Sequence, residues 1–330
     1  MPLANALIRL GAAMVSPRGD GARLSVLMYH RVVPEADALT GEVDARSFDV
    51  QLRVLRDCFN VLPLAEAVEL LAAGRLPSRA VAITFDDGYA DNESIALPML
   101  QQYRLPATFY IADGYLNGGR MFNDSVIESV RRTQKTHLDA SLPGLPALPV
   151  GSLAEKQSAL RRLIGHVKYL PLIERDVAIA KIAHASAATL PDDLMMRDEQ
   201  VRRLADAGMD IGGHTVNHPI LASIDLEAAR NEIETNRRTL TTLTGRTPTM
   251  FAYPNGVPRK DFVFAHADIV RTAGYRAAVT TSWGAARHGQ DLFQLPRFTP
   301  WDREPKRFAV RLMQNIVRNK PDILTSDTAG

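Results

Sequence analysis

The sequence has a single cysteine, Cys58, among its 330 residues. One cysteine cannot form an intramolecular disulfide, which excludes a disulfide-stapled secreted scaffold and a zinc site built from several thiolates. No apolar run approaches the roughly 20 residues that a membrane-spanning helix needs. Charge of one sign is also lacking, because 39 Lys and Arg against 37 Asp and Glu leave a net charge of +2. This balance gives no argument for binding nucleic acid or an anionic membrane.

A convincing export signal is missing as well. Arg9 interrupts the apolar N-terminal stretch instead of preceding it, so we expect a cytoplasmic protein. The segment 3–14 is predicted to form a short amphipathic helix that docks on the domain. Its apolar residues recur at helical spacing and are Leu3, Leu7, Leu10 and Met14. A weak membrane-surface anchor is the alternative, and it is less favoured because Arg9 is the only basic residue there.

Apolar residues make up 46% and charged residues 23% of the chain, as in an ordinary globular protein. Short apolar runs alternate with helical patterns, which predicts a parallel sheet with crossover helices. The expected strands are Leu24–Tyr29, Ala80–Phe85, Ala107–Ile111, Met209–Gly212, Met250–Tyr253, Arg276–Thr280 and Leu292–Leu295. The expected helices between them are Val50–Cys58, Leu64–Ala73, Ile95–Tyr103, Glu199–Ala207, Leu226–Leu243 and Phe262–Thr272. Periodicity does not distinguish a closed barrel from an open sheet.

The domain organisation follows from where this alternation holds. Residues 1–22 are expected to form an N-terminal helix and linker, 23–318 the main domain, and 319–330 a frayed tail. From about 113 to 196 the alternation is interrupted by what we interpret as a helical insertion. Its helices are expected around Ser125–Thr133, Leu153–Val167 and Ile173–Thr189. The prolines in Leu142–Pro149 predict a loop there.

Two adjacent carboxylates, Asp86 and Asp87, follow directly on the apolar run Ala80–Ile83 within the segment Thr-Phe-Asp-Asp-Gly-Tyr. In β/α barrels the active site lies at this C-terminal end of the strands. Neighbouring aspartates repel each other unless a positive group separates their roles. A metal does so by taking one carboxylate as a ligand and leaving the other as a base. A simple turn is the competing interpretation, because Asp-Gly is a common turn dipeptide.

Two histidines, His214 and His218, lie in Gly-Gly-His-Thr-Val-Asn-His-Pro, again after a short predicted strand. Their i, i+4 spacing would place both rings on one side of a helical turn. Two histidines and a carboxylate, with other positions open, describe a catalytic metal site. Surface or capping histidines are the alternative for this motif alone. The combination favours the metal site, because parallel strands bring their carboxyl ends together.

Three further residues lie near the ends of predicted strands. His30, in Met-Tyr-His-Arg, ends the first strand and Arg297, in Leu-Pro-Arg, ends the last, so both are expected at the mouth of the sheet. A structural role is the plainer interpretation of a single histidine such as His30. Asn255 belongs to a Pro-Asn-Gly turn whose backbone N–H groups could face an oxyanion.

These segments together resemble the polysaccharide deacetylases, the NodB-homology or carbohydrate esterase family 4 group. Residues 84–89 are similar to the first motif of that family, and 214–218 are similar to its second, a His-Ser/Thr-x-x-His pattern. The resemblance covers roughly residues 24–300, with 113–196 outside the shared core. It implies a deformed (β/α)₇ barrel, a divalent metal that is usually zinc, and hydrolysis of N-acetyl groups on a glycan. It also implies which side chains do this, with Asp86 as the general base and Asp87, His214 and His218 as metal ligands.

The sequence departs from the commonest family pattern at two places. The third motif usually reads Arg-x-Pro-Tyr, whereas this chain has Ala252 and Asn255 near the arginine and tyrosine positions. The last motif usually carries a histidine, which is absent beside Arg297. His30 and Arg297 supply the same residue types at other strand ends, as in the branch that begins with Met-Tyr-His and includes deacetylases of poly-N-acetylglucosamine. The resemblance then implies that His30 is the general acid and that Arg297 keeps Asp86 ionised. The backbone N–H of Asn255 would stabilise the oxyanion.

The expected function is therefore a metal-dependent hydrolase that removes N-acetyl groups from a polysaccharide or oligosaccharide, its partner being that glycan. The segment 113–196 is expected to shape the glycan groove without contributing a catalytic atom. A metal-dependent amidohydrolase acting on a small or peptidoglycan-derived amide is an alternative with the same metal site. A non-catalytic glycan-binding protein is the other, although a pure binder has no need of an open metal position. Acetate release from N-acetylated oligosaccharides distinguishes these possibilities.

Overall fold

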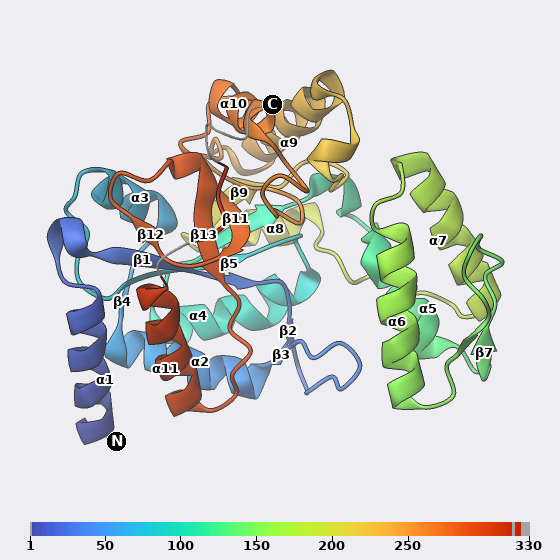
Figure 1. Cartoon of the computed structure of the whole chain (residues 1–330), viewed down its shortest axis with the longest axis horizontal. Helices are drawn as coiled ribbons and strands as arrows, with labels where there is room; N and C mark the ends of the chain where they lie inside the picture. Colours follow the sequence, from blue (N-terminus) through green and yellow to red (C-terminus); the bar gives the residue numbers. More distant parts are fainter. Residues whose placement is uncertain (1, 319–320, 325–330) are drawn as a thin grey trace.

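A closed barrel of parallel strands lies at the centre of the molecule (Figure 1). The computed structural model describes residues 2–318 and 321–324. Around the barrel the strands follow the order β1 (Arg23–Tyr29), β13 (Leu295–Phe298), β11 (Ala277–Trp283), β10 (Met250–Ala252), β9 (Asp210–Gly213), β6 (Thr108–Ile111) and β5 (Ala80–Phe85). β5 then pairs with β1 over five residue pairs, from Ser25–Val81 to Tyr29–Phe85, and closes the ring. The expected deformed (β/α)₇ barrel is confirmed.

The last barrel strand begins later than the sequence predicted. Residues Leu292–Gln294 form a short 3₁₀ turn (η5), and β13 begins only at Leu295. The cause is local, because the Asp291 side chain accepts a hydrogen bond from the Phe293 N–H at 3.0 Å and holds the turn. As a consequence Arg297 lies inside the strand, where it pairs with Val26 of β1.

Helices cover the outside of the barrel and alternate with its strands. They are α2 (Ala45–Cys58), α3 (Leu64–Ala72), α4 (Leu97–Tyr103), α8 (Asp198–Asp206), α9 (Leu226–Thr244), α10 (Phe264–Thr272) and α11 (Pro305–Val317). Their ends follow ordinary capping chemistry. Asp225 accepts the Ala228 N–H at 2.8 Å at the start of α9, and Gly245 ends that helix with φ +68°. Short strands flank the ring, with β4 (Asn60–Val61) parallel to β5 and β12 (Ala286–Arg287) antiparallel to β1.

The segment between β6 and β9 forms a helical lobe at one side of the barrel, on the right in Figure 1. Its helices α5 (Phe122–Arg132), α6 (Leu153–Val167) and α7 (Leu172–Ser186) pack around an apolar cluster of their own. The loop expected over Leu142–Pro149 is wrong at its end, because β8 (Leu148–Pro149) pairs with β7 (His137–Leu138). In so short a two-stranded ribbon both strands are edges, and an edge tolerates proline.

The N-terminal helix α1 (Pro2–Val15) docks against α2 and α11, but not through the expected apolar face. Ala12 is fully buried, whereas Leu7, Leu10 and Met14 are 62%, 58% and 68% exposed. The small Ala-Gly side of the helix approaches α11 closely, since a Cβ at Gly11 would lie 3.4 Å from the Met313 sulfur. The side chain of Leu3 lies outside the described residues. Among the described helices, none combines the length and apolar composition that a membrane span requires.

The chain end also differs in part from the frayed tail expected over 319–330. The Leu324 side chain is buried, and its backbone N–H donates a hydrogen bond to the Gln294 side chain. Residues 319–320 and 325–330 lie outside the described part of the chain.

Candidate active site

The carboxyl ends of the barrel strands gather the polar side chains that the sequence singled out. One cavity of about 300 Å³ is lined by His30, Asp86, Asp87, His214, His218 and Asn255. His30 follows β1, the two aspartates follow β5, His214 follows β9, and Asn255 comes shortly after β10. The parallel arrangement therefore does what the sequence predicted, because it brings chain segments far apart in sequence to one mouth of the barrel.

Asp86 is held by Arg297 in a two-pronged ion pair beneath this cavity. The guanidinium nitrogens donate to the two carboxylate oxygens at 2.6 and 2.7 Å, and Arg297 is fully buried. The Arg297 Nε donates to the Thr280 carbonyl at 2.9 Å, which fixes the plane of the guanidinium group. Burial alone would raise the pKa of Asp86, but the Arg297 guanidinium holds that pKa below its usual value. Asp86 is therefore an ionised carboxylate of fixed orientation.

Asp87, His214 and His218 form a cluster with the donor set of a metal site. Their ligand atoms all lie within 4.8 Å of one another. Asp87 Oδ1 is 3.3 Å from His214 Nε2 and 3.5 Å from His218 Nε2, yet it is buried without a hydrogen-bond partner of good geometry. Burial also lowers the pKa of His218 to about 3, which keeps its imidazole neutral as metal binding requires. Two imidazoles and one carboxylate fit a divalent cation such as zinc.

His214 is oriented by groups behind it. Its Nδ1 lies 2.7 Å from the Ala252 carbonyl oxygen, so this nitrogen carries the hydrogen and Nε2 is left free to act as a ligand. The backbone N–H of His214 donates to Asn236 Oδ1 at 3.0 Å. The preceding glycine is needed for close packing, because a Cβ at Gly213 would lie 2.0 Å from the Tyr275 hydroxyl oxygen.

The two histidines converge through a loop and not through the expected helical turn. No helix is assigned to residues 214–219, and Thr215 and His218 have φ values of +64° and +48°. Glu232 of α9 stabilises this strained loop, since its carboxylate accepts the backbone N–H groups of Val216 and Asn217 at 2.8 Å each. Ring centroids of His214 and His218 end 4.8 Å apart.

His30 and Asn255 complete the mouth of the cavity. The backbone carbonyl of His30 accepts a hydrogen bond from the Asn92 side chain at 2.8 Å, which anchors the chain where it leaves β1. Asn255 has φ +59°, and Thr281 donates to its carbonyl oxygen at 2.7 Å. The Nδ2 of Asn255 is buried without a hydrogen-bond partner. A donor in that condition is available to a bound ligand.

Sequence reasoning missed several residues that shape the site. Phe122 and Asn123 of α5, together with Lys168 at the end of α6, line the same cavity from the helical lobe. Asn123 Oδ1 is buried without a hydrogen-bond partner. Asn236 and Glu232 could have been identified from the sequence, because their i, i+4 spacing places both side chains on one face of a predicted helix.

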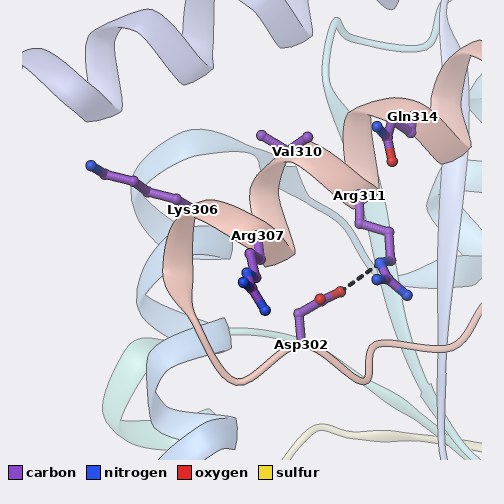
Figure 2. A pocket seen from close by; sticks show the side chains of 6 residues that line it. All are labelled: Asp302, Lys306, Arg307, Val310, Arg311 and Gln314. Atoms are coloured by element: carbon purple, nitrogen blue, oxygen red, sulfur yellow. Dashed lines mark ion pairs between the residues drawn. The ribbon is translucent and has the colours of Figure 1, made fainter.

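A second pocket, on the outer face of α11, does not resemble a hydrolytic site (Figure 2). It contains no histidine, and its one carboxylate, Asp302, forms an ion pair with Arg311 at 2.9 Å. His30, Asp86, Asp87, His214 and His218, by contrast, converge on the cavity at the barrel mouth.

Comparison with known proteins agrees with this geometry. Residues 73–139 and 168–278 match the polysaccharide deacetylase family. The matched ranges contain Asp86, Asp87, His214, His218 and Asn255, which are five of the residues at the barrel mouth. YxkH of Bacillus subtilis, named as a polysaccharide deacetylase, is 22% identical over 278 residues, covering 84% of this chain and 71% of its own.

Two solved structures share the fold over most of the chain. The deacetylase PplD of Streptococcus pyogenes, in complex with acetate, superposes with a TM-score of 0.59 at 20% identity, covering 89% of this chain and 98% of that one. IcaB of Ammonifex degensii superposes with a TM-score of 0.56, also at 20% identity, with the same coverage of 89% and 98%. At these identities the likeness concerns the fold.

Proposed function

Because the chain belongs to the polysaccharide deacetylase family, we propose that it hydrolyses N-acetyl groups on a glycan, with a divalent metal, zinc, held by Asp87, His214 and His218. The observation that carries this proposal is the juxtaposition of two carboxylates with different partners. Asp86 is ion-paired with Arg297 at 2.6 Å, while Asp87 lies against the two histidines. One carboxylate is thereby fitted to accept a proton and the other to bind a cation.

The chemistry follows from these positions. Asp87, His214 and His218 would hold the metal, which when bound would supply Lewis-acid polarisation of the acetyl carbonyl and a pKa of bound water lowered toward about 7. Asp86 accepts a proton from the attacking water, and Arg297 keeps the carboxylate turned toward it. The Asn255 backbone N–H donates a hydrogen bond to the oxyanion that develops on the acetyl oxygen.

His30 completes the reaction as the general acid. It lines the cavity together with Asp86 and comes from the neighbouring barrel strand. As the amide C–N bond breaks, His30 donates a proton to the departing nitrogen, so the products are acetate and a glycan amine. Two carboxylates and one imidazole thus take separate roles, which is how such sites run acid and base chemistry together.

Acetate release from N-acetylated oligosaccharides tests the proposal directly. The zinc-loaded protein should release acetate, a chelator should abolish this, and added zinc should restore it. Asp86→Asn is the matched inactive variant, because it removes the base and leaves the three ligands in place. It should therefore bind stoichiometric zinc by elemental analysis without turnover. Acetate release by Asp86→Asn at the wild-type rate would refute the assignment, and hydrolysis of a peptidoglycan-stem amide instead of the glycan would move it to another substrate class.

A further inference from the structure

The segment 86–92 carries the proposed base and one proposed metal ligand, and it also holds the chain around His30. It ends where η2 (Asn92–Ala96) begins, which is a π-helix and not an α-helix. Such π-helical turns are frequent at functional sites. His30 lies outside the ranges that match the family, whereas 86–92 lies inside them. Contacts between these two stretches of chain join the proposed acid to the proposed base.

Two hydrogen bonds connect the backbone at His30 to this segment. The Asp86 N–H donates to the Tyr29 carbonyl at 2.9 Å, directly before His30. The Asn92 Nδ2 donates to the carbonyl of His30 itself at 2.8 Å. Asn92 is fully buried, so no water can replace its side chain as the donor.

Asp91 holds the two residues that follow His30. Its carboxylate accepts the Arg31 Nε at 2.7 Å and the N–H of Val32, the first residue of β2 (Val32–Val33), at 3.2 Å. Asn92 Nδ2 also donates to the Asp91 carboxylate at 3.2 Å, so the two side chains stabilise each other. The chain that leaves β1 is thus held by a connected set of hydrogen bonds.

The imidazole of His30 has no such anchor of its own. Among the residues that the structure describes, a hydrogen bond ends on the His30 carbonyl oxygen and none ends on the ring. The place of the ring in the cavity is therefore set by the backbone that Asn92 holds. Proton donation needs the donor within hydrogen-bond reach of the departing nitrogen, and a displacement of about 1 Å can cost about 100-fold in rate.

We propose that Asn92, stabilised by Asp91, is a positioning residue that keeps His30 within reach of the departing nitrogen. Asn92 is not among the residues that line the cavity, so its effect on turnover passes through His30. The inference rests on the proposed function and names the side chain that sets the place of the acid.

The experiment compares two acetyl donors that differ in their leaving groups. An N-acetylglucosamine pentamer loses an amine, which needs a proton, whereas 4-nitrophenyl acetate loses a phenolate, which does not. Asn92→Leu keeps the approximate volume of the side chain and removes the hydrogen-bond donor, and Asn92→Ala is a second variant without any steric clash. Each should lower kcat on the pentamer by about 10- to 100-fold and leave KM and zinc content unchanged, with a far smaller loss on the nitrophenyl ester. Equal losses on both donors would overturn the inference.

A matched control lies in α11. Asn315 is also buried, and its Nδ2 donates to the Gly284 carbonyl at 2.9 Å, away from the cavity. Asn315→Ala should therefore turn over both donors as the wild type does. In a His30→Ala background, Asn92→Ala should have no further effect on kcat, because no acid remains to be positioned. A loss that multiplies with that of His30→Ala would show a separate role for Asn92 and refute the inference.

A spectroscopic measurement separates this inference from the proposed function. The ring signals of His30 are followed by NMR in zinc-loaded protein labelled with ¹⁵N-histidine, and they are assigned by their absence from His30→Ala. Asn92→Ala should shift or broaden these signals, whereas Asn315→Ala should leave them unchanged. This result supports the positioning even if the wild type releases no acetate, in which case the proposed reaction alone fails. Unchanged His30 signals in Asn92→Ala overturn the positioning whatever the turnover.

Discussion

Removing the Arg297 guanidinium should show how strongly the fold and the proposed base depend on one ion pair. Arg297 is fully buried and meets Asp86 at 2.6 and 2.7 Å, so the guanidinium has no water to replace its partner. Removing one member of such a pair leaves an uncompensated buried charge and costs about 3–5 kcal/mol. We therefore expect Arg297→Met to lower the free energy of unfolding by that amount, as measured by urea denaturation with a chelator present.

A double-mutant cycle isolates the pair from the rest of the packing. Asp86→Asn alone should also be destabilising, because it leaves the guanidinium without its counter-charge. The double variant Asp86→Asn/Arg297→Met carries no buried charge, so its loss should fall short of the sum of the single losses by about 3 kcal/mol. Arg203→Met is the matched control, since Arg203 pairs with Glu93 at 2.7 Å but is 55% exposed, and its loss of stability should be much smaller than that of Arg297→Met. Additive losses at Asp86 and Arg297 would refute the reasoning.

The same variants separate catalysis from stability. Arg297→Met should reduce turnover of a glycan substrate by about 100-fold or more, because a proton on Asp86 removes the base. Arg297→Lys should recover only part of that loss, since an ammonium group cannot match both carboxylate oxygens at once. Zinc content should stay at the wild-type level in both, because the three ligands are other residues. Loss of zinc would instead mean that Arg297 supports the metal site.

Three further predictions use other groups of the site. His214→Ala should lose zinc and activity together by elemental analysis and acetate assay, and retained stoichiometric zinc would show that the ligand set is wrong. His30→Ala should keep zinc but lower turnover by about 10²- to 10⁴-fold and lose the basic limb of the pH–rate profile; unchanged turnover would exclude it as the acid. Burial raises the pKa of Asp124 from 3.8 to about 7, so the folded state increasingly opposes its ionisation as pH rises from about 4 through 7. Asp124→Asn should therefore be neutral at about pH 4 and stabilising by as much as about 4 kcal/mol at about pH 8, and an equal effect at both pH values in urea unfolding would contradict this.

Much of the barrel could be predicted because its strands are buried on both sides. Ala80–Phe85 is buried at every position and reads as a continuous apolar and β-branched run. The last strand could not be placed correctly, since Leu292 and Phe293 are apolar as in a buried strand but lie in a turn that the Asp291 side chain holds. For α1 the spacing of its apolar residues predicted the helix correctly. Which face of α1 packs on the domain depends on α11, almost 300 residues away in the sequence.

The candidate site likewise contains residues that could be placed from the sequence and residues that could not. Asp86, Asp87 and His214 follow strands directly, and the rule that strand ends meet was sufficient to bring them together. The position of His218 was predicted through a helical turn that does not exist, because its loop is shaped by Glu232 on a distant helix. Asn123 could not be found from its local sequence, because what makes it a cavity residue is the packing of the helical lobe against the barrel mouth.

Barrel closure itself connects the fold to the proposed chemistry. His30 and Arg297 lie outside the ranges that match the family, near the two ends of the domain. β1, which His30 follows, pairs with β5 on one side and with β13 on the other, so the step that closes the ring also carries both residues to Asp86. An open sheet with the same strands would retain the proposed metal ligands after β5 and β9 but would leave Asp86 without its arginine. The proposed metal site thus depends on β5 and β9, which flank β6 in one half of the barrel, whereas the proposed base and acid depend on its closure. A variant that loosens β13 should therefore lose turnover before it loses zinc.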